Sequence, residues 1–125
     1  MKINLDGTKP IFQQISDEIE DAVFTGAFPE ETQVPSTTEI SAAFRINPAT
    51  VLKGMNQLVD AGILYKKRGL GMFVTAGASE KIRRKRQKLF SETYVRPLLE
   101  EAAKLGISEE EMIQMIERGI RDEQD

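Results

Sequence analysis

The fold of this chain is decided by residues 34–59, VPSTTEISAAFRINPATVLKGMNQLV. Ser36 and Glu39 have the spacing of a capping box, in which each side chain accepts a hydrogen bond from the other residue's backbone N–H, so a helix is predicted to begin there. Asn47 and Pro48 begin another helix, as an N-cap and a proline at the first helical position. The stretch therefore predicts two helices joined by a tight turn.

The second of these helices has a regular apolar face. Val51, Met55, Leu58 and Val59 follow one another at i, i+4, i+7 and i+8, and Gly62 is a typical helix stop. We expect these four side chains to lie in the core. The opposite face is predicted to lie mostly outside and carries Ala49, Thr50, Lys53, Asn56 and Gln57.

Segments on either side supply another helix and a β-hairpin. Upstream, apolar residues recur at helical spacing over residues 11–23, until Gly26 ends the pattern. Downstream, residues 63–67 and 72–75 are predicted strands joined by a glycine-containing turn with basic residues near its tip. These elements, in this order, predict a winged helix-turn-helix.

The rest of the chain is predicted to be a helical tail. Residues 76–79 are small and polar and form a predicted linker, so we place a winged helix-turn-helix domain at 1–78 and the tail at 79–125. The predicted fold is mainly α with a small β-hairpin: an N-terminal winged helix-turn-helix followed by a C-terminal helical hairpin for dimerisation.

The tail shows two helical segments. The first extends from Glu80 past Pro97, which kinks or restarts it, to a stop at Gly106, and a second capping box at Ser108 begins the last helix. Because domains under about 60 residues are only marginally stable, this hairpin cannot bury its apolar side chains alone. Its apolar faces need a partner.

Charge is distributed unevenly along the sequence. The net charge is -3, yet residues 66–88 contain nine basic side chains and one acidic side chain. Such asymmetry is typical of a surface that meets nucleic acid or another acidic partner. For residues 81–88 alone, a solvated helix face is equally consistent with the pattern.

Several classes of function are excluded by composition. The 125 residues include no cysteine and no histidine, which removes disulfides, thiolate nucleophiles, imidazole bases and the usual zinc sites. The adjacent Glu109, Glu110 and Glu111 suit a helix start better than acid–base catalysis. We expect no enzyme and no cofactor or metal. Without an apolar run of membrane-spanning length or a secretory signal, we expect a cytoplasmic protein with no membrane partner.

The residues from 10 to 74 resemble the N-terminal DNA-binding domain of the GntR family of bacterial transcription regulators. Three motifs carry this resemblance, namely Val34-Pro35-Ser36 with Glu39-Ile40, Ile46-Asn47-Pro48-Ala49-Thr50-Val51, and Gly62-Ile63-Leu64 to Gly69-Leu70-Gly71-Met72-Phe73-Val74. The Asn47-Pro48 form and the tail motif at 96–108 are similar to the short YtrA-type branch. The resemblance thus covers nearly the whole chain.

The resemblance implies a transcriptional repressor that binds a palindromic operator in double-stranded DNA as a homodimer. The second helix of the helix-turn-helix would enter the major groove and the wing would lie at the minor groove. The DNA-binding residues would be Ser36, Thr37, Thr38, Asn47, Ala49, Thr50, Lys53, Lys66, Lys67, Arg68, Gly69 and Gly71. The tail would be a dimerisation helix pair, using Leu89, Phe90, Tyr94, Leu98, Leu99, Ala102, Met112, Ile113 and Ile116.

Three places depart from the family pattern at positions where arginine is common. They hold Thr38, Pro48 and Leu52. Because arginine is the usual bidentate partner of guanine, the chain lacks the family's strongest groups for base recognition. Lys53, next to the last of them, is the candidate replacement.

Two further departures concern the backbone. Arg45 stands where the family turn usually has glycine, so a left-handed conformation there would cost about 1 kcal/mol; alternatively, the turn is shaped differently. Gly54 replaces a residue that is often alanine, which costs about 1 kcal/mol of helix propensity but permits close helix approach.

Alternative functions remain open at this point. Asn47, Pro48 and Ser36 are equally consistent with plain helix-starting roles. The whole chain could be a winged-helix protein-interaction module whose basic segment binds an acidic partner or RNA, which the missing arginines favour slightly. A small-molecule effector could bind a crevice, but no residue set specifies its identity.

Overall fold

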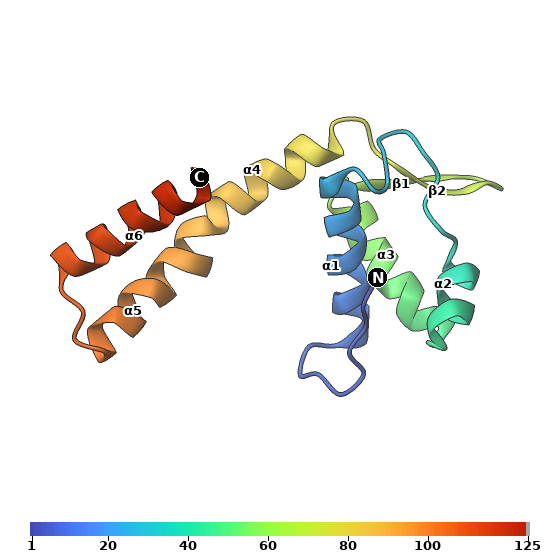
Figure 1. Ribbon diagram of the computed structural model, residues 1–125. Coiled ribbons are helices and arrows are strands. Elements are labelled where there is room, and N and C mark those ends of the chain that lie inside the picture. The colour runs from blue at the N-terminus through green and yellow to red at the C-terminus, as the bar shows by residue number, and fades with distance from the viewer. Residues whose placement is uncertain (125) are drawn as a thin grey trace. The chain divides into compact units, whose positions relative to one another are not determined.

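The computed structural model describes residues 1–124 and divides into two compact units, Met1–Lys85 and the residues from Arg86 onward. The elements, in order, are α1 (Ile11–Thr25), α2 (Thr37–Phe44), α3 (Pro48–Asp60), β1 (Leu64–Lys67), β2 (Gly71–Val74), α4 (Ala78–Phe90), a π-helical turn (Ser91–Val95), α5 (Arg96–Lys104) and α6 (Glu109–Gln124) (Figure 1). The predicted fold class, mainly α with a winged helix-turn-helix, is confirmed.

One continuous core holds the first unit together. The inner faces of α1 and α3 meet there, and α2, both strands and the start of α4 close around them. The fully buried side chains are Ile15, Ile19, Val23, Val51, Met55, Ile63, Leu64, Val74 and Ile82. Of the four predicted core residues of α3, Val51, Met55 and Leu58 are buried and Val59 is half-buried.

Helices α1 and α3 approach each other closely at Gly54. A Cβ atom at this position would lie 2.6 Å from the backbone oxygen of Phe12 and 3.2 Å from the Cβ of Ile15. Only glycine fits this separation without movement of the α1 backbone. The predicted role of Gly54 in close helix approach is therefore confirmed, and this contact fixes which face of α3 points outward.

Both predicted helix starts in the helix-turn-helix are present. Ser36 Oγ accepts a hydrogen bond from Glu39 N at 3.0 Å, while Glu39 Oε1 accepts one from Ser36 N at 3.2 Å. Asn47 Oδ1 accepts from Ala49 N at 2.8 Å and begins α3. Only residues 45–47 separate the two helices.

The two strands pair in antiparallel fashion, with Tyr65 opposite Phe73 and Lys66 opposite Met72. An isolated bridge joins Gln33 to Phe73 at the edge of this hairpin. The hairpin is thereby anchored to the segment that leads into α2, which places its tip beside the N-terminus of that helix.

The boundary between the units lies further along the chain than the predicted linker. Residues 78 and 79 are already helical, and Ala78 and Ile82 on the first turns of α4 are buried in the core of the first unit. Ser79 Oγ also donates to Phe24 O at 3.2 Å. Because these contacts bind α4 to α1, the compact unit ends at Lys85 instead of residue 78.

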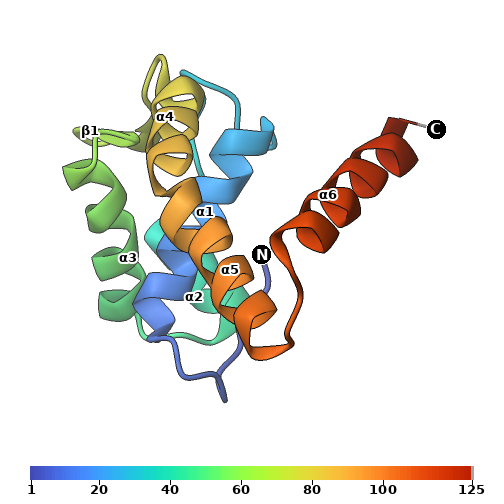
Figure 2. The same ribbon diagram turned by 90° about the vertical axis from the view of Figure 1, so that its left-hand side faces the viewer.

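The second unit consists of helices with little buried surface. Pro97 lies at the start of α5, immediately after the π-helical turn. A proline has no N–H to donate, and in a regular α-helix its ring clashes with the carbonyl group four residues earlier. The wider π-helical turn before Pro97 accommodates both features. Figure 2 shows α5 and α6 as an open pair joined by the turn at 105–108. Ala102 is the only buried side chain of the described residues 86–124.

None of the helices in residues 1–124 is long and apolar enough to cross a membrane.

We predict that Gly54→Ala destabilises the first unit by about 1–2 kcal/mol, because overpacking against the α1 backbone outweighs the gain of about 1 kcal/mol in helix propensity. Urea denaturation followed by circular dichroism measures this difference. Gly119→Ala in α6 is the matched control, since an added Cβ there meets nothing within 4 Å. Equal or greater stability of Gly54→Ala would contradict the packing argument.

Candidate nucleic-acid interface

The wing of the fold is the β1–β2 hairpin. A groove of about 380 Å³ lies between the N-terminus of α2 and this wing. It brings together eight of the twelve predicted DNA-binding residues, namely Ser36, Thr37, Thr38, Lys66, Lys67, Arg68, Gly69 and Gly71. Met55 and Met72 also line it. Residues more than 25 positions apart in sequence thus form one surface with hydroxyls on one side and cations on the other.

The α2 side of the groove offers hydroxyls and a helix N-terminus. The Ser36 hydroxyl is used in the capping box, and Thr37 Oγ1 contacts Met55 Sδ at 3.6 Å. Thr38 is exposed. Because the first turn of a helix has N–H groups without intrahelical acceptors, this side suits a phosphate.

The two lysines of β1 point to opposite sides of the hairpin. Lys66 is opposite the buried Met72, on the side of the sheet that faces the core and the groove. The Nζ atom of Lys67 instead lies 4.4 Å from the centroid of the Phe73 ring and 5.7 Å from that of Tyr65. Lys67 is therefore partly engaged in cation–π contacts, while Lys66 has no ion-pair partner among residues 1–124.

The tip of the wing is held by Gln33. Its Nε2 donates to Leu70 O at 2.6 Å. Gly71 adopts a φ of +125°, and a Cβ there would come within 2.8 Å of the same Nε2 atom, so the position requires glycine. Arg68 is exposed at the tip without an ion pair among the described residues. Leu70 is also 64% exposed, and sequence reasoning did not single it out.

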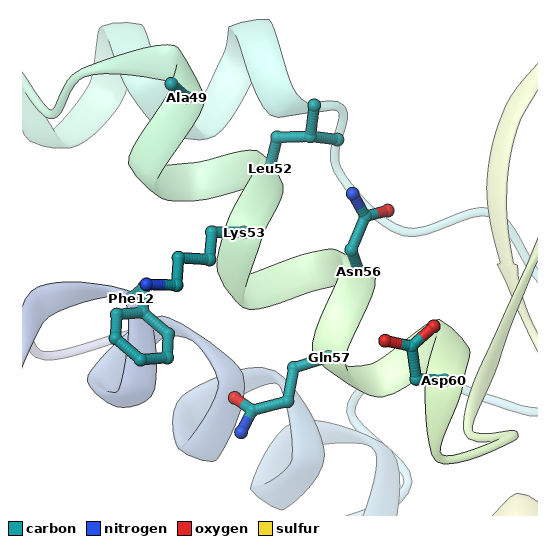
Figure 3. A pocket seen from close by; sticks show the side chains of 7 residues that line it. All are labelled: Phe12, Ala49, Leu52, Lys53, Asn56, Gln57 and Asp60. Carbon is teal, nitrogen blue, oxygen red and sulfur yellow. The ribbon is translucent and has the colours of Figure 1, made fainter.

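A second hollow of about 500 Å³ lies along the outward face of α3 (Figure 3). Its lining consists of Phe12, Ala49, Leu52, Lys53, Asn56, Gln57 and Asp60. Of the predicted set it contains Ala49 and Lys53. The Lys53 Nζ lies 4.0 Å from the centroid of the Phe12 ring, so this cation is drawn toward α1.

Asn56 is a polar residue of this hollow that the predicted set omits. Its Oδ1 is buried without a hydrogen-bond partner in the structure. In the sequence, Asn56 stands one turn after Leu52, and this position alone does not distinguish it from a solvent-exposed asparagine.

The two remaining predicted residues line neither hollow. The Asn47 side chain caps α3, which is the plain helix-starting role that the sequence left open. Thr50 is half-buried near the same turn.

Much of the basic block in α4 is paired within the chain. Glu80 accepts ion pairs from Arg83 at 3.2 Å and Arg84 at 3.4 Å, and Lys85 pairs with Glu20 of α1. Arg86 is also engaged. This pattern favours the solvated-face interpretation of residues 81–88 and concentrates the available positive charge at the wing.

Arg45 occupies the turn between α2 and α3 in a left-handed conformation, with φ 54° and ψ 49°. Its backbone N–H donates to Ser41 O, which ends α2. Of the two shapes that the sequence allowed for this turn, the strained one is present.

A winged helix-turn-helix whose cationic wing lies beside the N-terminus of α2 is typical of DNA-binding regulators. The family model described as "Bacterial regulatory proteins, gntR family" matches residues 11–74. The chain belongs to this family of bacterial transcription regulators. The resemblance predicted from the motifs is confirmed.

Relatives of known name share part of their length with this chain. It is 32% identical over 75 residues to the HTH-type transcriptional repressor NagR of Bacillus subtilis, which is 60% of this chain and 31% of NagR. It is 27% identical over 78 residues to the HTH-type transcriptional repressor YtrA of the same organism, which is 62% of this chain and 60% of YtrA. The chain therefore spans about a third of NagR and less than two thirds of YtrA.

Two solved structures bear on the fold and the site. A transcriptional regulator of the GntR family from Bacteroides thetaiotaomicron has a TM-score of 0.72 and 32% identity, covering 90% of this chain and 98% of that one. The DNA-binding domain of AraR, solved in complex with operator ORX1, has a TM-score of 0.56 and 25% identity, covering 60% of this chain and 96% of that one.

We predict that Arg45→Gly makes the first unit about 0.5–1 kcal/mol more stable than Arg45→Ala. Both variants remove the guanidinium. A residue with a Cβ atom loses about 1–2 kcal/mol in the left-handed conformation, and only glycine avoids this cost. The larger conformational entropy of glycine in the unfolded chain offsets part of this gain. Thermal and urea unfolding of the two variants measure the difference. Equal stabilities would mean that the turn is not strained.

Proposed function

We propose that this regulator is a repressor that binds a two-fold symmetric DNA operator as a homodimer. The observation that carries the proposal is the groove in which Lys66 and Arg68 of the wing face the N-terminus of α2, next to the outward face of α3. NagR and YtrA are named as repressors, and the AraR domain was solved on an operator. These likenesses support the same role here.

The proposed docking inserts the N-terminal half of α3 into the major groove. Asp60 ends the outward stripe of α3, and its carboxylate would meet phosphates unfavourably, so the first turns approach the bases more closely. The wing then lies along the adjacent minor groove, with Arg68 and Gly69 at its tip. Thr38 and the first N–H groups of α2 would hold a backbone phosphate.

The second unit is proposed to form the dimer. Among residues 86–124, ten large apolar side chains are 45 to 65% exposed, while Met112 is half-buried and Ala102 is buried. The ten are Leu89, Phe90, Tyr94, Leu98, Leu99, Leu105, Ile113, Met115, Ile116 and Ile120. Soluble monomers rarely leave so many large apolar side chains of one small unit exposed. A second copy of the same helices would cover it, which also matches a two-fold operator.

The proposal is tested by enriching duplexes from a random pool on the full chain and measuring saturable binding to the enriched sequence. Enrichment of a palindrome bound by two chains supports it. Binding that ignores sequence would contradict it and favour the interaction-module interpretation.

The two wing lysines provide a matched pair for the groove. We predict that Lys66→Gln weakens operator binding about fivefold at about 100 mM salt and lowers the salt slope by about one. Lys67→Gln, one residue away, should lower the slope by less, because its ammonium lies over Phe73 on the other side of the hairpin. Fluorescence anisotropy between about 50 and 200 mM salt measures both. Equal effects of the two variants would show that the groove side of the hairpin is not the DNA side.

For the dimer, we predict that Leu99→Glu or Ile116→Glu produces monomers, because a buried carboxylate would face apolar partners. Operator affinity should then fall about a hundredfold or more, since one half-site is lost. Light scattering after size exclusion measures the mass, with Leu5→Glu as the control at an exposed leucine of the first unit. A monomeric wild-type chain, or unchanged mass in both variants, would contradict the proposed interface.

A further inference from the structure

Leu52 is an exposed apolar side chain on the helix proposed to enter the major groove. It is 40% exposed, although the inner face of α3 already supplies Val51, Met55 and Leu58 to the core. Its neighbour one turn earlier on the outward face is Ala49, also exposed. Burial in the chain's own core therefore does not account for a leucine at this position.

Two polar side chains of this hollow, Lys53 and Gln57, are turned toward α1, while Asn56 lies on the same side of α3 as Leu52 (Figure 3). Figure 3 shows Lys53 and Gln57 pointing to α1, while Leu52 points away from it. The Lys53 ammonium lies over the Phe12 ring, and Gln57 Nε2 donates to Gln13 Oε1 at 3.0 Å. These contacts hold the two polar groups to one side. Leu52 and Ala49 thus form the apolar part of the surface that the first turns of α3 present.

The major groove contains one apolar group, the C5-methyl of thymine, and contacts to it come from apolar side chains. A leucine has no donor for guanine and no acceptor for cytosine. We propose that Leu52, together with Ala49, contacts a thymine methyl and selects a T·A pair at that place in each half-site. This inference rests on the proposed DNA-binding function and names a specificity-determining residue for it.

The test removes only the methyl group. In the enriched operator, each thymine is replaced in turn by deoxyuridine, which keeps every hydrogen-bonding group of the base. Wild-type chain should bind about three- to tenfold more weakly when one particular thymine of each half-site is replaced. Leu52→Ala should lose most of this discrimination, while Leu5→Ala, at an exposed leucine of the N-terminal segment, should keep the wild-type ratio.

A gain-of-specificity variant completes the experiment. Enrichment with Leu52→Arg should replace the thymine at that position by guanine, because arginine pairs bidentately with guanine. The inference is overturned if wild type tolerates uracil at every position, or if Leu52→Ala keeps the discrimination. A failure of the proposed function is distinguishable, because then no duplex is enriched at all.

Discussion

The contact of Gly54 with the backbone of α1 is the constraint on which the rest of the candidate interface depends. With no side chain between them, α3 packs directly on α1, and its rotation about its own axis is fixed by Val51, Met55 and Leu58 in the core. Which residues point outward follows from that rotation. A bulkier residue at 54 would shift α3 and move every outward side chain with it.

Placement of charge explains how a chain of net charge -3 presents a surface suited to DNA. Glu80 and Glu20 take up basic side chains of α4. No carboxylate lines the wing groove, and neither Lys66 nor Arg68 forms an ion pair among residues 1–124, so their charge is not neutralised by a direct partner. Because phosphate attraction decays over roughly 10 Å at 0.1 M salt, local charge matters more for docking than the total.

Sequence reasoning predicted the helices, their caps and the winged arrangement because each depends on local chemistry, such as the reciprocal hydrogen bonds of Ser36 and Glu39. It also selected most residues of the wing groove. It did not show that Ala78 and Ile82 pack in the core of the first unit, because their sequence pattern is the same as that of an exposed linker and helix start. Cation–π contacts such as that of Lys67 with Phe73 depend on side-chain direction across strands, and the prominence of Leu70 depends on the turn it occupies.

The proposed symmetry compensates for the small number of base-recognising groups on α3. Lys53 is drawn to Phe12, and Thr38, Pro48 and Leu52 stand where arginine is common in the family. Most proposed contacts of the first unit of one chain are therefore to phosphates, which do not distinguish sequences. A thymine methyl contributes only a modest preference in one half-site. In a homodimer the same preference counts twice in free energy, so the ratio of affinities is squared. Selectivity would thus depend on the apolar face of the second unit as much as on α3.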